Sequence, residues 1–147
     1  MYTHLLVPID GSQLSERAAQ ASLELARKLG ARVTGFVAES MPPLPGMGTA
    51  MSTYTRDVEN HQARTEAHAR EVLAKFGAKA AEQGVAFDGK FLRTDAVDDA
   101  IVSAAAEYDC DLIVMVTHGR GAFGELLFGS HTKNVLARCK LPLLVLH

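Results

Sequence analysis

Residues 4–38 read HLLVPIDGSQLSERAAQASLELARKLGARVTGFVA, and this stretch decides the fold class. The run His4–Ile9 is almost continuously apolar, as expected for a strand covered on both faces of a sheet. A short turn follows, and Ser12 is a favourable N-terminal cap. Apolar residues at spacings of three and four then predict a helix that ends at Gly30. Arg32–Ala38 is the next strand, so the stretch is one strand–helix–strand unit.

The rest of the chain repeats this alternation. After the first unit we expect a loop over Met41–Thr55, a helix over Arg56–Gln83, a strand over Val85–Arg93, a helix over Ala96–Tyr108 capped by Asp95, a strand over Leu112–Val116, a helix over Ser130–Cys139 and a strand over Pro142–Leu146. This order predicts an α/β fold in which helices cover both faces of a parallel sheet. Such sheets bind ligands at the carboxyl ends of their strands. No domain boundary is visible, so we expect one domain over residues 1–147.

Composition excludes several classes of protein. Of the 147 residues 48% are hydrophobic and 22% charged, which is typical of a globular chain. The formal net charge of −2 gives no indication of a nucleic-acid or membrane partner. The two cysteines have no metal-binding spacing, which favours a reducing compartment. Because the first ten residues carry no Lys or Arg, we expect no signal peptide and a cytoplasmic protein.

The most informative stretch is 117–134, which joins the last-but-one strand to the last helix and contains four glycines. Its pair Gly129-Ser130 stands where that helix begins, and free N–H groups at a helix N-terminus favour phosphate. From His118 to Lys140 there are four Lys or Arg residues and one acid, Glu125. An anionic ligand suits this pattern. The alternative explanation is that the glycines only allow a tight turn and that the basic residues lie on a helix face exposed to water.

Two known nucleotide motifs do not fit. Gly119, Gly121 and Gly124 spell G-x-G-x-x-G after a strand, but a dinucleotide site also needs an acidic residue ~20 positions on. No acidic residue follows Glu125, so we reject a dinucleotide site. The P-loop pattern G-x-x-x-x-G-K-[ST] is absent as well.

Other reactive side chains give weaker signals. His61 and His68 are two helical turns apart, but no third metal ligand stands near them in the sequence, so we expect no structural metal site. No nucleophile and base accompany His118 in a catalytic pattern. Cys110 and Cys139 are expected to be small core residues.

Several motifs in order resemble the universal stress protein family over essentially the whole chain. They are Val7-Pro8-Ile9-Asp10-Gly11-Ser12, Leu112-Ile113-Val114-Met115, Thr117-His118-Gly119-Arg120-Gly121, Gly129-Ser130 and Pro142-Leu143-Leu144-Val145. The resemblance implies a Rossmann-like, adenine nucleotide alpha hydrolase-like fold with five parallel strands in the order 3-2-1-4-5. It also implies a homodimer that forms through the last strand, residues 141–147.

The resemblance further implies a site for ATP with Mg²⁺. Its residues are Pro8, Asp10 and Val37 around the adenosine, Met115 and Val116 beside the ribose, and Gly119, Gly129, Ser130 and His131 at the phosphates. Asp10 would accept hydrogen bonds from the nucleoside or help to hold a hydrated metal ion. The alternative is an aspartate that only shapes the turn with Ser12.

One departure concerns the signature G-x-x-G, nine residues, G-[ST] of the ATP-binding branch. Gly119 and Gly129-Ser130 match it, but Val116 replaces its first glycine and would crowd the ribose. Three hypotheses follow: a nucleotide-binding stress or signalling module in which ATP orders the Met41–Thr55 loop, a dimeric interaction protein without nucleotide, and a slow ATPase. We expect no enzymatic activity beyond weak ATP hydrolysis.

Overall fold

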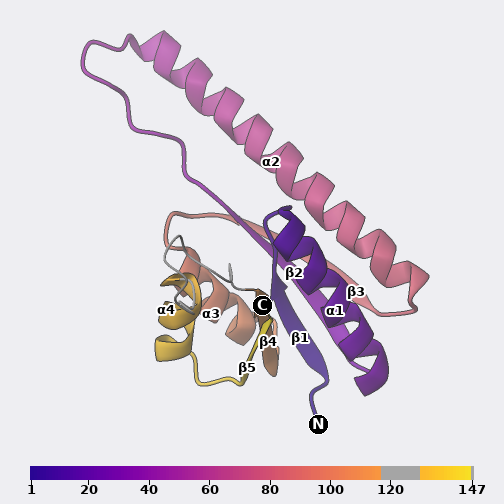
Figure 1. Ribbon diagram of the computed structural model, residues 1–147. Coiled ribbons are helices and arrows are strands. Elements are labelled where there is room, and N and C mark those ends of the chain that lie inside the picture. Colours follow the sequence, from indigo (N-terminus) through magenta and orange to yellow (C-terminus); the bar gives the residue numbers. More distant parts are fainter. Residues whose placement is uncertain (117–129, 147) are drawn as a thin grey trace.

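The computed structural model describes residues 1–116 and 130–146 of the chain. In chain order its elements are β1 (His4–Pro8), α1 (Gln13–Leu29), β2 (Arg32–Glu39), α2 (Met51–Glu82), β3 (Phe87–Arg93), α3 (Val97–Glu107), β4 (Leu112–Val116), α4 (Ser130–Arg138) and β5 (Leu143–Leu146). Their arrangement is shown in Figure 1. The α/β alternation predicted from the sequence is confirmed.

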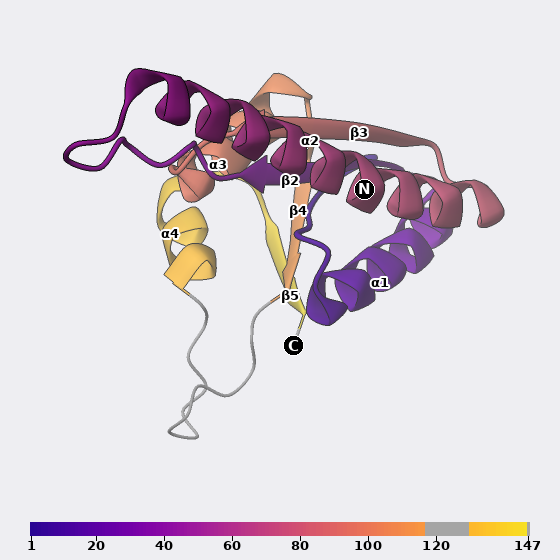
Figure 2. The ribbon, with the colours of Figure 1, turned by 90° about the horizontal axis from the view of Figure 1, so that it is seen from above.

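The five strands form one parallel sheet in the order β3-β2-β1-β4-β5. This is the order that the family resemblance implied. The strand order changes direction between β1 and β4. The helices that follow these two strands, α1 and α4, therefore lie on opposite faces of the sheet. Figure 2 shows α1 and α4 on the two sides of the sheet.

The caps of α1 are those that the sequence predicts. Ser12 has extended backbone angles, and its hydroxyl accepts a hydrogen bond from the Ser15 N–H at 3.2 Å. Gly30 has a φ of 67°, a left-handed conformation that favours glycine. These two residues therefore fix where the first crossover helix begins and ends.

Two local predictions are wrong. Helix α2 begins at Met51, within the segment predicted as a loop, because neither proline nor glycine occurs between there and Gly77. The cap of α3 is Ala96 instead of Asp95. The Asp95 carboxylate accepts a hydrogen bond from the Met41 N–H at 3.1 Å instead, and so ties the end of β2 to the start of α3.

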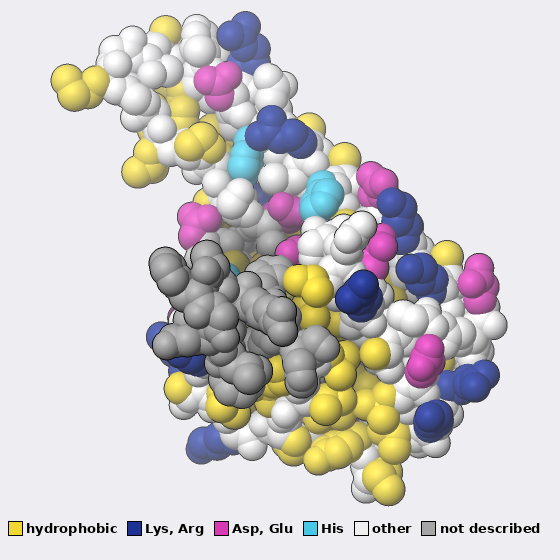
Figure 3. Space-filling view, viewed as in Figure 1, with side chains coloured by type: hydrophobic (Ala, Val, Ile, Leu, Met, Phe, Trp, Pro, Cys, Tyr) yellow, Lys and Arg dark blue, Asp and Glu magenta, His cyan; other side chains and the backbone are white. Residues whose placement is uncertain are grey.

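The first part of α2 and the connection before it project beyond the sheet (Figures 1 and 3). Leu44, Met47 and Met51 are strongly exposed there. The projection is tied to the body at its base, where His61 contacts the Ser40 carbonyl at 2.9 Å. Among residues 1–116 and 130–146, no helix is both long enough and apolar enough to cross a membrane.

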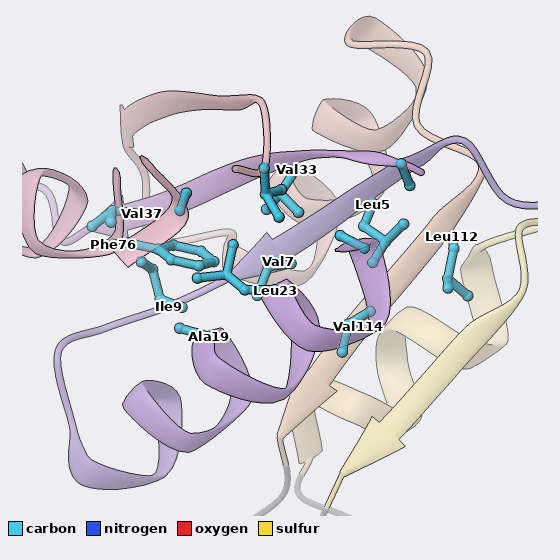
Figure 4. Close-up of a cluster of buried hydrophobic side chains, with 14 of the residues drawn as sticks. Leu5, Val7, Ile9, Ala19, Leu23, Val33, Val37, Phe76, Leu112 and Val114 are labelled. Carbon is cyan, nitrogen blue, oxygen red and sulfur yellow. The ribbon is translucent and has the colours of Figure 1, made fainter. Parts of the chain in front are cut away.

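Alternating side chains of the strands build two buried clusters. The first cluster lies between the sheet and helices α1 and α2, where Phe76 packs against Phe87 with ring centres 4.8 Å apart. Figure 4 shows Phe76 among side chains from β1, β2 and α1. The second cluster lies between the sheet and helices α3 and α4, and includes Phe36, Ile101 and Val135.

Candidate functional site

A cavity of about 300 Å³ opens at the carboxyl ends of β1 and β4, on the side of α3 and α4. Its described lining is Pro8, Ile9, Asp10, Ser12, Ser15, Phe36, Ala38, Val97, Ile101, Met115, Val116, His131 and Thr132. The cavity lies where the strand order reverses, which is the usual ligand position in an open α/β sheet. Its volume is that of a small-molecule site.

One wall of the cavity is apolar. It is formed by Phe36 and Ala38 from β2 and by Val97 and Ile101 from α3, which pack in one apolar cluster. Phe36 is 2% exposed and Ile101 also 2%, so packing holds both side chains in place. A flat aromatic ring fits this wall, since it replaces water against a fixed hydrophobic surface.

The opposite part of the lining is polar and comes from the turn between β1 and α1. The Asp10 carboxylate accepts a hydrogen bond from the Ser12 N–H at 2.9 Å. The Gly11 N–H donates to the Ser15 hydroxyl oxygen at 3.1 Å, and Gly11 has a φ of 84°. Asp10 therefore does shape its turn, and it lines the cavity as well.

The first turn of α4 contributes His131 and Thr132 to the lining of the cavity. Thr132 is buried, with 3% of the residue exposed. The positive end of the α4 dipole lies at this turn, which favours an anionic group in the cavity.

The structure brings most of the described candidate residues together. Pro8, Asp10, Met115, Val116 and His131 all line the cavity. Ser130 is the first residue of α4, next to this lining. Gly119 and Gly129 lie outside the described residues, as does His118.

Val37 is placed differently from the sequence interpretation. Its side chain is 1% exposed and belongs to the cluster beneath α1 and α2, on the other face of the sheet. Successive residues of a strand point to opposite faces, so Phe36 and Ala38 line the cavity instead. Only the backbone of Val37 remains available to a ligand at the end of β2.

Sequence reasoning did not single out Phe36, Ala38, Val97, Ile101 or Thr132. The alternation along β2 was the one available signal for the first two. None of residues 41–55 lines the cavity, so a loop ordered by ligand stays a prediction.

The remaining reactive side chains are held in structural contacts. His68 contacts the Glu39 carboxylate at 2.5 Å, and His61 contacts the Ser40 carbonyl. Within residues 1–116 and 130–146, no three His, Cys, Asp or Glu residues are grouped to hold a metal ion. Cys110 is buried, and this burial raises the pKa of its thiol to about 11. A thiol of that kind stays protonated and unreactive at neutral pH.

Comparisons with known proteins agree on one family. A model of the Universal stress protein family matches residues 1–147. A universal stress protein of Thermus aquaticus is 30% identical over 146 residues, which cover 99% of this chain and 98% of that protein.

Two solved structures of similar fold contain an adenine nucleotide. A universal stress protein in complex with cAMP has a TM-score of 0.70 and 23% identity, covering 99% of this chain and 97% of that chain. The universal stress protein from Archaeoglobus fulgidus in complex with dAMP has a TM-score of 0.65 and 23% identity, covering 99% and 98%.

Proposed function

The chain belongs to the universal stress protein family, and on that premise we propose that it binds ATP with Mg²⁺ in the cavity at the carboxyl ends of β1 and β4. In this proposal the protein is a cytoplasmic, nucleotide-responsive module of stress signalling. Two relatives of similar fold were solved with adenine nucleotides, which supports the ligand class.

The observation that carries the proposal is the chemistry of the cavity lining. An apolar wall from β2 and α3, the Asp10 turn and the first turn of α4 meet around one space. A nucleotide has the matching parts, since its base is flat and largely apolar, its sugar carries hydroxyls and its phosphates are anionic. We therefore assign the base to the Phe36 and Ile101 side and the ribose to Asp10, Met115 and Val116.

The phosphates are assigned to the backbone N–H groups of Gly119, Gly129, Ser130 and His131 and to the Ser130 hydroxyl. Asp10 is the single carboxylate among the described residues that line the cavity. Mg²⁺ that arrives with the phosphates needs few protein ligands, so the residues present fit the ion. The ion would neutralise part of the phosphate charge, and Asp10 would bind it directly or through water.

Calorimetric titration of nucleotide-stripped protein with Mg-ATP tests the proposal. We expect saturable binding near one nucleotide per chain. The double variant Gly129→Ala with Ser130→Ala should bind more weakly, because it adds side-chain bulk and removes a hydroxyl at the phosphate position. A matched control is Gly89→Ala with Ser103→Ala, two exposed positions outside both the cavity lining and the Met41–Thr55 segment. Unchanged affinity in the first variant contradicts the assigned site.

A second candidate function is favoured by Val116, which lines the cavity where the family signature has glycine. If its branched side chain excludes the ribose, the protein works as a dimeric interaction module without nucleotide. Binding that appears only after Val116→Gly would support this candidate. Phosphate release from bound ATP, measured in the same preparations, tests whether the protein is a slow ATPase.

The proposed homodimer uses residues 141–147. Strand β5 is an edge of the sheet, and Leu144 on it is 37% exposed. An unpaired apolar edge strand pairs readily with a second copy. We expect Leu144→Lys to lower the molecular mass measured by light scattering from dimer to monomer. Leu92→Lys on the other edge strand, β3, is the control and should leave the mass unchanged.

A further inference from the structure

Polar contacts hold α4 against α3 at both ends of α4. Near the start of α4, the Asp98 carboxylate meets the His131 ring Nδ1 at 2.5 Å through one oxygen. Its other oxygen accepts a hydrogen bond from the Asn134 side-chain amide at 2.7 Å. Near the end of α4, Arg138 forms an ion pair with Asp99. Asp98 and Asp99 are neighbours in the first turn of α3.

The two contacts differ in their relation to the cavity. His131, held by Asp98, lines the cavity, and Thr132 beside it does too. Arg138 is at the far end of the helix and does not line the cavity. The side chain of Asp98 is 16% exposed, whereas that of Asp99 is 61% exposed. The Asp98 carboxylate is therefore the better shielded of the two acids, while the partner side chains His131 and Arg138 are both more than half exposed. Asp98 also makes two hydrogen bonds to α4, one with His131 and one with Asn134.

We infer that Asp98 is a positioning residue that fixes the first turn of α4 at the cavity, and that this gives the site its preference for phosphate-bearing nucleotides over the bare nucleoside. The inference rests on the proposed nucleotide function. Both carboxylate oxygens are used on side chains one turn apart on α4, which fixes the rotation of the helix as well as its distance from α3. The direction of the backbone N–H groups at the start of α4 depends on that rotation.

Simple electrostatics predicts the opposite effect of removing Asp98. A carboxylate close to bound phosphate repels it, so deletion of the negative charge alone would tighten phosphate binding. Loss of the helix position would weaken it. The sign of the change therefore separates the positioning role from a charge effect, and a nucleoside without phosphate reports on the rest of the cavity.

The experiment compares Asp98→Ala with Asp99→Ala in titrations against adenosine, AMP and Mg-ATP. For Asp98→Ala we expect AMP and ATP to bind about tenfold more weakly, because the N–H groups at the start of α4 lose the position that Asp98 gives them. Adenosine should bind within about twofold of the wild type, because the apolar wall and the Asp10 turn are unchanged. Asp99→Ala removes a carboxylate of the same helix turn and should leave the ratio of AMP to adenosine affinity unchanged.

A purely structural role would lower the melting temperature and weaken all three ligands together, which would overturn the inference. Tighter AMP binding in Asp98→Ala would overturn it too. If Asp98→Ala does not fold, Asp98→Asn replaces it, since the amide keeps one acceptor and should show the same loss at smaller size. Wild-type protein that binds none of the three ligands contradicts the proposed function itself, and the inference with it. Wild-type binding with an unchanged ratio in Asp98→Ala contradicts the inference alone.

Discussion

On the face of the sheet covered by α1 and α2, a hollow of about 140 Å³ lies beside Ile9 and Phe76, whereas on the face covered by α3 and α4 a cavity of about 300 Å³ lies at the carboxyl ends of the strands. Both faces use the same strands, and neighbouring residues of β2 supply each of them. The first face receives Val33, Val37 and the bare backbone of Gly35. The second receives Thr34, Phe36 and Ala38.

The difference follows from the helices. Helix α2 brings Phe76 onto the first face, and the ring fills the space over Gly35. On the second face α3 contributes mainly alanines and Ile101, and α4 contributes Val135. The α3 side chains that border the cavity are Val97 and Ile101, and the space between them and Phe36 and Ala38 of β2 is part of the candidate site. We conclude that the first face mainly stabilises the fold and the second provides the site.

The largest expected effect compares two buried phenylalanines, one on each face. Phe76→Ala should lower the free energy of unfolding by about 3–5 kcal/mol, because its ring is surrounded by the first cluster and leaves a void. Phe36→Ala should cost less stability, because the space that it leaves joins the larger cavity of about 300 Å³, whereas Phe76 borders only the hollow of about 140 Å³, but it should weaken nucleotide binding. Urea unfolding and nucleotide titration of both variants check this. Equal stability losses would contradict the division between the faces.

A smaller effect is expected from adding atoms instead of removing them. A Cβ at Gly35 would lie 2.8 Å from Phe87 and 2.9 Å from Phe76, both in ring atoms. Gly35→Ala should therefore lower the free energy of unfolding by about 1–3 kcal/mol, the usual penalty of overpacking. Ala38→Leu points into the cavity and should reduce nucleotide affinity while changing stability little. Thermal unfolding and calorimetry distinguish these two results, and a stable Gly35→Ala protein would show that the first face is loosely packed.

Much of this comparison could be predicted from the sequence. Strand β4 has the predicted bounds Leu112–Val116, and Ser12 and Gly30 cap α1 as expected. These predictions succeeded because unbroken apolar runs and cap residues act through the nearest few positions of the chain. The strand order came from the family resemblance, since no local pattern specifies which strands are neighbours.

The rest depends on contacts between distant residues. Asp98 and His131 are 33 positions apart, and neither sequence neighbourhood indicates the other. Asp95 resembles a helix cap but bonds to Met41, 54 positions away, because the end of β2 is brought beside it. The side chain of Val37 points away from the cavity for a different reason. Strand β2 was predicted to end at Ala38 and ends at Glu39, but the face to which each of its residues points was not followed along the strand.

The smallest expected effect concerns His4, at the amino end of the second face. Its ring is buried, and its Nε2 lies 2.7 Å from the Thr34 hydroxyl. Burial, together with the positive charge of Arg32, lowers the pKa of His4 below its ordinary value of 6.5. Near pH 6, His4 is therefore protonated to a greater extent in the unfolded chain than in the folded protein.

Because the pKa of His4 is lowered in the folded protein, its titration does not affect the free energy of unfolding well above pH 6.5. As the pH falls below that value, the titration lowers the free energy of unfolding. His4→Gln keeps a group that can hydrogen-bond to Thr34 but cannot take up the proton. The free energy of unfolding should therefore fall less steeply between pH 7 and pH 5 in this variant than in the wild type. Urea unfolding at each pH measures the two slopes, and the difference between them removes the contributions of the other histidines. Equal slopes in the two proteins would mean that water reaches the His4 ring in the folded state and that its pKa is not lowered. The second face would then be open to water at the amino ends of its strands as well as at the cavity.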